Sequence, residues 1–328
     1  MKFDRRMALA GMGAVASWPP IAAAAGRSGA VPFVPSKGPK SRVLMVNDLS
    51  GDFDGLFAAA HAVMSPSIDL RGLISSNAQG SDQTGAKGLA LGGEMLRLMR
   101  AHDRVPLLVG AETRLVGDNQ AIASAGTRRI IDEAMRRDTR LPLFVAVGGG
   151  LTEVASALIL QPEIAKRMTL VWIGGGMPDE YNFAIDPIAA QHIFNDTEVP
   201  IWQVPADVYA MCQVSMTELQ AFVSPCGAIG AWLYKQALGV DQLLKNYPVN
   251  PGETWSMGDS PLVLLTALGD FAGRMGMNAY SSLVTPSLTA RGVAQPRESG
   301  RKMRLYERID TRLMFSDFYA KLKVNFGR

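Results

Sequence analysis

The chain contains little cysteine and little histidine. Cys212 and Cys226 are the only cysteines among 328 residues, and the three histidines are scattered along the chain. No spacing typical of a zinc site is therefore present. Export from the cytoplasm would permit a disulfide between the two cysteines, whereas two buried free thiols are equally compatible with their spacing. The sequence leaves both states open.

The chain also lacks a large excess of positive or negative charge, and it lacks long apolar runs. The formal net charge is +3, and no Lys/Arg run is interleaved with aromatic residues, so nucleic acid is not an expected partner. No apolar stretch of membrane-spanning length follows the N-terminal segment. Apolar residues make up 48% of the chain, which at this length allows one large α/β domain or two smaller ones.

The first residues have the pattern of an export signal. A basic segment that includes Arg5 and Arg6 precedes a weakly apolar stretch and small residues suited to cleavage. We therefore predict a signal peptide over residues 1–25, with the arginine pair favouring the twin-arginine route and the Sec route left open. A linker is predicted over 26–40 and a single domain over 41–328. The mature protein is expected in the periplasm or outside the cell.

Strand-like apolar runs alternate with helical patterns along the body of the chain. Strands are expected at residues 43–46, 69–75, 105–109, 143–147, 169–173 and 200–204. Helices are expected at residues 85–100, 127–137, 153–160, 187–194, 216–244 and 312–322. This alternation predicts a single α/β domain with an open, mostly parallel sheet flanked by helices.

Three aspartates follow the first predicted strand. Asp48, Asp52 and Asp54 lie in a short turn between that strand and an apolar helical segment. Open α/β sheets bind ligands at the carboxyl ends of their strands, and packed carboxylates repel one another unless a cation joins them. The turn therefore predicts a divalent-metal site. The alternative is a solvated turn in which an aspartate caps the following helix.

Further motifs follow this acidic turn in a fixed order. A Gly-rich Leu-Thr turn spans residues 147–153, a Glu-Tyr-Asn segment leads to Asp-Pro within 180–187, and a Gly-Asp pair stands at 258–259. This series resembles the inosine-uridine preferring nucleoside hydrolase family over about residues 43–322. The chain has two Gly-rich turns after predicted strands, at 148–150 and 174–176. Neither has the spacing of a dinucleotide or phosphate loop, so we expect their glycines to let the backbone closely approach a group at the carboxyl edge of the sheet.

The resemblance implies a calcium-dependent enzyme that hydrolyses the N-glycosidic bond of a ribonucleoside or a related ribosyl compound. By similarity to the family, Asp48 would ligate calcium and act as the base on the attacking water. The metal ligands implied are Asp48, Asp52, Asp54, Thr152 through its carbonyl, and Asp259. The substrate-binding residues implied are Asn77, Glu180, Asn182 and Trp255. Family relatives are often dimers or tetramers, which implies that a homo-oligomer can form.

The sequence departs from the family at two positions of the expected site. Gly55 stands where the family has the second of two adjacent aspartates, a bidentate metal ligand, so calcium binding is expected to be weaker. Gly258 stands where nonspecific members have a histidine that protonates the leaving base, and glycine has no side-chain proton to donate. Trp255 and Tyr247 are candidates for stacking on a base instead.

Several of these residues also have a purely structural interpretation. Asp186 before Pro187 is an ordinary helix start, with Asp as the N-cap. Glu180 and Asn182 are compatible with a polar loop, and Asp259 and Thr152 with helix caps. The two glycine departures keep open an alternative function, a non-catalytic periplasmic protein that binds a sugar or nucleoside. A carboxylate-based phosphatase is a third, weaker alternative.

Overall fold

The computed structural model describes residues 32–78, 85–117, 119–240, 250–269 and 278–327. The predicted boundaries of the signal peptide at 1–25 and of most of the linker therefore lie outside the described residues. The described part of the linker, residues 32–40, contains no helix or strand. None of the helices in the described ranges is long and apolar enough to span a membrane.

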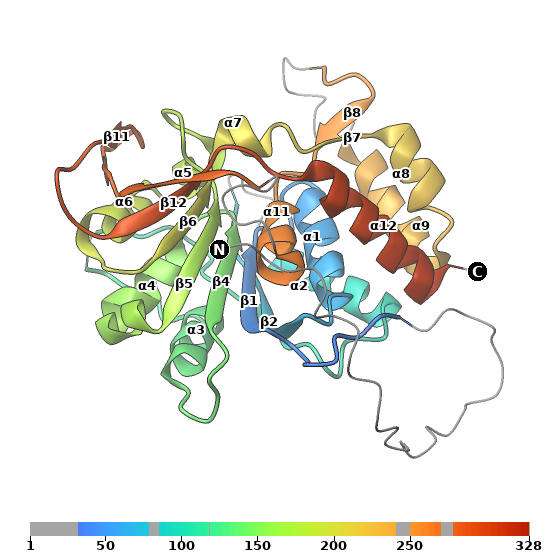
Figure 1. Ribbon diagram of the computed structural model, residues 1–328, viewed down its shortest axis with the longest axis horizontal. Helices are drawn as coiled ribbons and strands as arrows, with labels where there is room; N and C mark the ends of the chain where they lie inside the picture. Colours follow the sequence, from blue (N-terminus) through green and yellow to red (C-terminus); the bar gives the residue numbers. More distant parts are fainter. Residues whose placement is uncertain (1–31, 79–84, 118, 241–249, 270–277, 328) are drawn as a thin grey trace, which may run out of the picture. The chain divides into compact units, whose positions relative to one another are not determined.

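The described residues form an α/β unit around one large sheet (Figure 1). In spatial order its strands are β3 (Leu107–Val109), β2 (Ile68–Ser75), β1 (Ser41–Asn47), β4 (Leu143–Gly148), β5 (Met168–Ile173), β6 (Ile201–Val204), β12 (Lys302–Tyr306) and β9 (Tyr280–Val284). All neighbouring pairs are parallel except β12 with β9, which is antiparallel. The predicted fold class is confirmed.

The central strands are apolar along their whole length because both faces of the sheet are covered. Every residue of β1 is buried, and β4 and β5 are buried except for one partly exposed position each. Their Val, Leu and Ile side chains alternate between two hydrophobic cores, so that Val43 and Met45 enter one core and Leu44 and Val46 enter the other. The continuous apolar runs that predicted strands are thus the signature of a doubly covered sheet.

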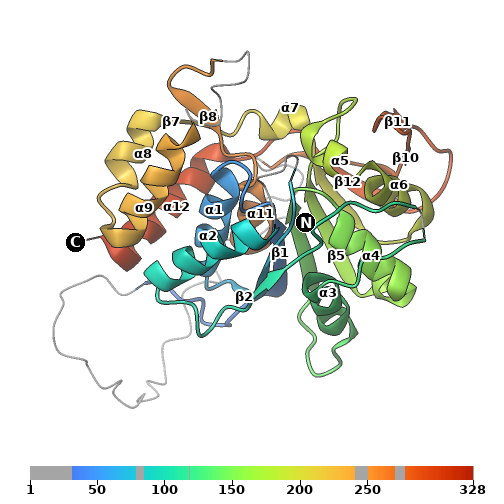
Figure 2. The same cartoon turned by 180° about the vertical axis from the view of Figure 1, so that it is seen from behind.

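Two groups of helices cover the two faces, as both views show (Figures 1 and 2). The helices of the first face are α1 (Asp54–Val63), α2 (Gly85–Leu98), α8 (Met216–Phe222), α9 (Gly227–Leu238), α11 (Pro261–Val263) with its π-helical continuation (Leu264–Leu268), and α12 (Thr311–Phe326). The helices of the second face are α3 (Ala125–Met135), α4 (Thr152–Leu160) and α6 (Pro187–Asp196). Shorter elements are the 3-10 helix Pro162–Lys166, α5 (Tyr181–Ile185), α7 (Ala206–Tyr209), the pair β7 (Gln213–Ser215) and β8 (Thr254–Ser256), and the pair β10 (Ser287–Leu288) and β11 (Ala294–Gln295).

One helix prediction is wrong. The segment predicted as a single helix over 216–244 is divided into α8 and α9, with Val223–Cys226 between them. Pro225 lacks the N–H that a continuous helix would need at this point, so the first helix ends before it. Residues 241–249, at the end of the predicted helix, lie outside the described residues.

One cysteine lies before α8 and the other lies between α8 and α9. Cys212 and Cys226 are both buried free thiols in the structure, which decides between the two states that the sequence left open. Burial raises the pKa of the Cys212 thiol to about 12 and also raises that of Cys226. Both groups are therefore neutral at physiological pH and behave as small apolar side chains.

Candidate active site

The acidic turn lies directly at the carboxyl end of β1. The N–H of Asp48 donates to the carbonyl of Gly148 at the end of β4 (3.4 Å), and its carbonyl accepts from the N–H of Gly51 (2.6 Å). Asp54 begins α1, and its N–H donates to Oδ1 of Asp52 (3.1 Å). These bonds fold the turn back over the sheet edge, where open α/β sheets bind ligands.

Asp259 reaches the same place from the opposite part of the chain. It precedes α11, and its Oδ2 accepts from Nδ2 of Asn47 at 2.6 Å, while its backbone N–H donates to Oδ2 of Asp54 at 3.0 Å. A Cβ atom on Gly148 would lie only 2.2 Å from Oδ1 of Asp259. Glycine is thus required at the end of β4 so that this carboxylate can approach the backbone, as predicted for the Gly-rich turn.

The carboxylates of this cluster repel one another in a buried setting. Burial, followed by the charges of Asp259 and Asp52, raises the pKa of Asp48 well above its usual value. Burial and the same two neighbours raise the pKa of Asp54. Burial and the charge of Asp52 raise the pKa of Asp259 to about 8, although the bond from Asn47 opposes this shift. No Lys or Arg in the described part of the chain pairs with these groups to offset the repulsion.

The donors that meet here fit a hard divalent cation in kind. They are all oxygen atoms, as calcium prefers, and Oδ1 of Asn47 is buried without a hydrogen-bond partner in the described structure. They do not form a complete set of metal ligands. In the described ranges, no group of three or more Asp, Glu, His or Cys side chains is placed to hold a metal ion. Asp259 contacts both Asn47 and Asp54, and its charge acts on Asp48.

Glu180 fastens the loop that follows β5. Its carboxylate accepts hydrogen bonds from the N–H groups of Gly175 (2.6 Å), Asn182 (3.1 Å) and Phe183 (3.0 Å) and from the hydroxyl of Tyr209 (2.6 Å). A carboxylate offers about four acceptor positions, so all are in use. The side-chain amide of Asn182 donates to the carbonyl of Ile173 at 2.9 Å. The predicted ribose contacts of both residues therefore compete with contacts inside the protein.

Thr152 is the first residue of α4, and its hydroxyl donates to Oδ2 of Asp186 at 2.7 Å. Asp186 is the N-cap of α6, where its Oδ1 accepts from the N–H of Ala189. Its Oδ2 also accepts from the N–H of Leu115 at 2.9 Å. The structural interpretation of Asp186 is confirmed, and Asp186 in turn fixes the start of the helix that carries Thr152.

Replacing Asp186 with alanine is expected to destabilise the fold. The change leaves the N–H groups of Ala189 and Leu115 and the hydroxyl of Thr152 buried without acceptors, which should lower the free energy of unfolding by about 2–5 kcal/mol. Urea denaturation measures this effect. Asp196→Ala, at the exposed end of the same helix, is the control and should change stability by less than about 0.5 kcal/mol. Equal effects of the two variants would contradict the anchoring role of Asp186.

Asn77 and Trp255 come from separate parts of the chain. Asn77 follows β2, and its Oδ1 is buried with no hydrogen-bond partner among the described residues. Trp255 lies on β8, and its indole N–H donates to Oδ2 of Asp52 at 3.2 Å, while its ring packs against Phe53 with centroids 6.1 Å apart. Tyr247, its predicted stacking companion, lies outside the described residues.

The two departures from the family motif face the carboxylate cluster. A Cβ atom on Gly55 would lie 3.1 Å from Nδ2 of Asn47 and 3.3 Å from Oδ2 of Asp259. A Cβ atom on Gly258 would lie 3.2 Å from the ring of Tyr209 and 3.4 Å from Oδ2 of Asp54. A side chain at position 55 would thus point at the cluster, and one at 258 would displace Tyr209.

Sequence reasoning missed three polar groups of the site. Asn47 orients Asp259, Tyr209 donates to Glu180, and the hydroxyl of Ser76 after β2 is buried without a partner in the described ranges. Asn47 and Ser76 directly follow the carboxyl ends of predicted strands. That position in the sequence could have identified them as residues of the site. Nothing in the sequence near Tyr209 indicated its place.

Fold and site together place a cluster of buried carboxylates at the carboxyl edge of a parallel sheet, where open α/β folds bind their ligands. The chain belongs to the inosine-uridine preferring nucleoside hydrolase family, whose model matches residues 45–269. It is therefore a glycosyl hydrolase of the kind that cleaves N-glycosidic bonds. The family expected from the order of motifs is confirmed. No curated protein matches the chain at a significant level.

Solved structures of nucleoside hydrolases share the fold at low sequence identity. A plant nucleoside hydrolase is 15% identical with a TM-score of 0.67, and the match covers 87% of this chain and 99% of that one. A purine-preferring ribonucleoside hydrolase from Gardnerella vaginalis is 16% identical with a TM-score of 0.67, covering 85% and 98%. An inosine-uridine preferring nucleoside hydrolase from Bacillus anthracis is 14% identical with a TM-score of 0.63, covering 87% and 99%. At such identities the likeness shows the fold alone.

Proposed function

We propose that the protein is an exported, calcium-dependent N-ribohydrolase that acts on a ribonucleoside or a related ribosyl compound. The observation that carries this proposal is the buried cluster of Asp48, Asp54 and Asp259, whose pKa values are raised first by burial and then by the charges of neighbouring carboxylates. A fold does not retain such a cluster for stability, because buried carboxylates without a cation are costly. Nucleoside hydrolases are typically metal-dependent, which supports a divalent cation as the missing partner.

Asp48, Asp259 and Asn47 are the proposed inner ligands, with Thr152 contributing its carbonyl and Asp52 or Asp54 joining after a small movement of the turn. A bound calcium ion would supply Lewis acidity toward the attacking water and would attract the hydroxyls of a ribose. Calcium affinity is expected to be modest, because Gly55 removes one carboxylate from the set and affinity follows the charge of the ligands.

Asp48 is the proposed base. It takes a proton from the attacking water while the bond between the anomeric carbon and the leaving base breaks, with the water oxygen becoming the new hydroxyl of the sugar. The sugar passes through an oxocarbenium-like state, which the neighbouring carboxylates of Asp54 and Asp259 stabilise by their negative charge. Asn77 offers an unpartnered amide oxygen for a ribose hydroxyl.

The leaving base receives no side-chain proton from position 258, which is glycine. Tyr209 packs at this position, but burial and the charge of Glu180 raise the pKa of its phenol, and its proton is already given to Glu180. We therefore infer that ribosyl compounds with a good leaving group are the better substrates, since they need the least protonation.

The test is hydrolysis by the purified mature protein with and without calcium. We expect release of free sugar from a ribonucleoside in calcium, faster release from 4-nitrophenyl riboside, and at least a tenfold loss with a chelator, restored by added calcium. Binding of ribonucleosides by calorimetry with no product over hours would instead favour the non-catalytic sugar-binding alternative. Hydrolysis that is unaffected by chelation would refute the calcium requirement.

Localisation and assembly belong to the same proposal. The mature chain is proposed to act in the periplasm or outside the cell after loss of residues 1–25, and to form a homo-oligomer. Cell fractionation and N-terminal sequencing test the first statement. Size-exclusion chromatography with light scattering tests the second, and a purely monomeric species would contradict it.

A further inference from the structure

The loops that lead into the central strands form a positively charged edge of the sheet. Strands β3, β2, β1, β4 and β5 are parallel neighbours, so the segments that precede them lie along one edge, opposite the edge that carries the acidic turn. Before β3, β4 and β5 these segments are residues 99–106, 136–142 and 161–167. Their exposed basic side chains, which we name the basic edge, are Arg100, Arg104, Arg137, Arg140, Lys166 and Arg167. The five strands span about 19 Å, at about 4.8 Å between neighbours.

Acidic side chains offset only part of this charge. The carboxylates of the same segments are Asp103, Asp138 and Glu163. Asp138 accepts two hydrogen bonds from the guanidinium group of Arg136, at 2.9 and 2.8 Å. Arg137 and Arg140 make no hydrogen bond or ion pair within the described residues, so their charges are available to a partner.

The opposite edge of the same strands is acidic. The described segments that follow these five strands contain one basic residue, Arg114, and the acidic residues Asp48, Asp52, Glu112, Asp179 and Glu180. The formal net charge of the whole chain is only +3, so positive and negative charge are separated between the two edges. An anionic surface would therefore attract the basic edge and repel the edge of the candidate active site, which sets the orientation of the protein on that surface.

The described N-terminal segment adds apolar side chains on this side of the molecule. Residues 32–40 run to the start of β1 along the basic edge (Figure 1), and the N–H of Lys40 donates to the carbonyl of Ser67, directly before β2, at 2.8 Å. Phe33 is 80% exposed and Val34 is 66% exposed. Apolar side chains beside basic ones are typical of segments that lie in the interface of a lipid bilayer.

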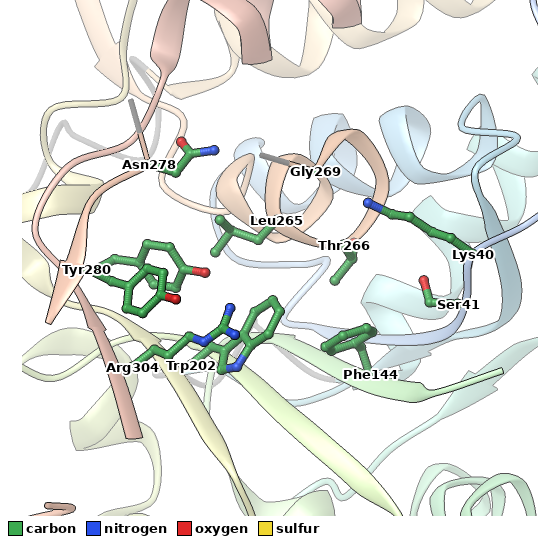
Figure 3. Close-up of a pocket in the computed structure, with 11 residues that line it drawn as sticks. Lys40, Ser41, Phe144, Trp202, Leu265, Thr266, Gly269, Asn278, Tyr280 and Arg304 are labelled. Atoms are coloured by element: carbon green, nitrogen blue, oxygen red, sulfur yellow. The ribbon is translucent and has the colours of Figure 1, made fainter. Parts of the chain in front are cut away.

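The side chain of Lys40 does not belong to the basic edge. It turns toward Gly269 and lines a cavity of about 350 Å³ between the start of β1 and the π-helical segment (Figure 3). A Cβ atom on Gly269 would lie 3.0 Å from Nζ of Lys40. The positive charge of the edge therefore comes from the loops before β3, β4 and β5.

We propose that the basic edge, together with Phe33 and Val34, docks the protein on an anionic phospholipid bilayer. Each exposed Lys or Arg strengthens the attraction to anionic headgroups, and the two apolar side chains enter the boundary between headgroups and acyl chains. A nucleic acid would match the charge but would offer no apolar layer for Phe33 and Val34. The acidic edge faces away from the bilayer, so the candidate active site stays open to solution. The docking surface is independent of the proposed hydrolysis.

The test is co-sedimentation of the full mature protein with lipid vesicles in chelator, which prevents calcium from joining carboxylates to lipid phosphates. We expect binding to mixed phosphatidylglycerol and phosphatidylcholine vesicles that is at least about tenfold stronger than to phosphatidylcholine alone. Binding should fall at least about tenfold between about 0.1 M and about 1 M salt, because the Debye length shortens from about 10 Å to about 3 Å.

Two results would overturn the proposal. One is equal binding, or no binding, to the two kinds of vesicle, because the charge of the lipid would then play no part. The other is that duplex DNA displaces the protein from the anionic vesicles at equal phosphate concentration, which would assign the basic edge to nucleic acid.

Two double variants locate the charged part of the surface. Arg137→Gln with Arg140→Gln should weaken binding to the anionic vesicles by at least about tenfold. Both side chains are exposed, so the fold should be kept, and thermal unfolding verifies this. Arg114→Gln with Arg312→Gln removes the same charge from exposed positions at the opposite edge and should leave binding unchanged. Equal losses in the two double variants would overturn the basic edge as the docking surface.

A third variant tests the apolar part. Phe33→Ser with Val34→Ser should weaken binding to the anionic vesicles by at least about threefold, because two side chains no longer enter the interface. Val116→Ser, at a position that is 79% exposed after β3, is the matched control and should bind normally. Unchanged binding of the double variant would overturn the part assigned to Phe33 and Val34.

Discussion

Asp48→Asn is expected to lower kcat for ribosyl hydrolysis by about 10³-fold or more, within the range that general-base catalysis contributes. Asparagine has nearly the same shape as aspartate, so the turn that Asp48 forms with Gly51 and Gly148 through backbone bonds should persist. The amide cannot take a proton from the attacking water. It also removes one negative charge from the proposed calcium ligands, so the affinity for calcium should fall as well.

The measurement is steady-state hydrolysis at saturating calcium, with calcium affinity determined separately by titration. Asp103→Asn, in an exposed turn where the carboxylate is 91% exposed, controls for the loss of a charge and should keep full activity. If Asp48→Asn retained the rate of the unchanged protein, the assignment of Asp48 as base would be refuted. Thermal unfolding of both variants verifies that the fold is kept. Without calcium, Asp48→Asn is expected to gain stability because a repelling charge is removed.

Gly55→Asp is expected to tighten calcium binding by about tenfold, equivalent to about 1.4 kcal/mol. The Cβ atom that this change adds lies 3.3 Å from Oδ2 of Asp259, so the new carboxylate starts beside the cluster. An additional carboxylate raises calcium affinity through both charge and ligand number. Without calcium the same charge adds to the repulsion already present, and the amide of Asn47, 3.1 Å from the new Cβ, must shift slightly.

Two measurements separate the effects of Gly55→Asp. Calorimetry gives the calcium affinity, and thermal unfolding with and without calcium should show a lower Tm in chelator and a larger calcium-dependent rise than in the unchanged protein. Gly93→Asp is the matched control, because Gly93 also lies within a helix and has only Leu107 near its missing Cβ, at 3.9 Å. Unchanged calcium affinity in Gly55→Asp would mean that the cluster is not where the ion binds.

The structural features that depend on local sequence pattern could be predicted from the sequence. The apolar runs gave the central strands, because both faces of the sheet are buried, and the acidic turn was recognisable since Asp48 directly follows one of them. The break between α8 and α9 was missed although Pro225 signalled it, because the apolar spacing continues on both sides. Strands β9 and β12 were missed because neither contains the continuous apolar run that marked the central strands.

The contacts that decide what each site residue does depended on the tertiary structure. Asp259 was singled out only through the family resemblance, since its bond to Asn47 joins positions 212 residues apart. Nothing in the sequence indicated that the carboxylate of Glu180 would accept its hydrogen bonds from other groups of the protein. Arg104 and Lys166 share one edge of the sheet only because β3 and β5 run parallel to the strands between them.

The bonds that Glu180 accepts have a consequence for substrate capture. They tie Gly175, Asn182, Phe183 and Tyr209 to one carboxylate before any sugar arrives. The loop after β5 has therefore already lost its conformational freedom during folding, and a ligand that docks on it does not bear that entropic cost. Selectivity at this side of the site follows from a rigid template that accepts or rejects a ligand by shape.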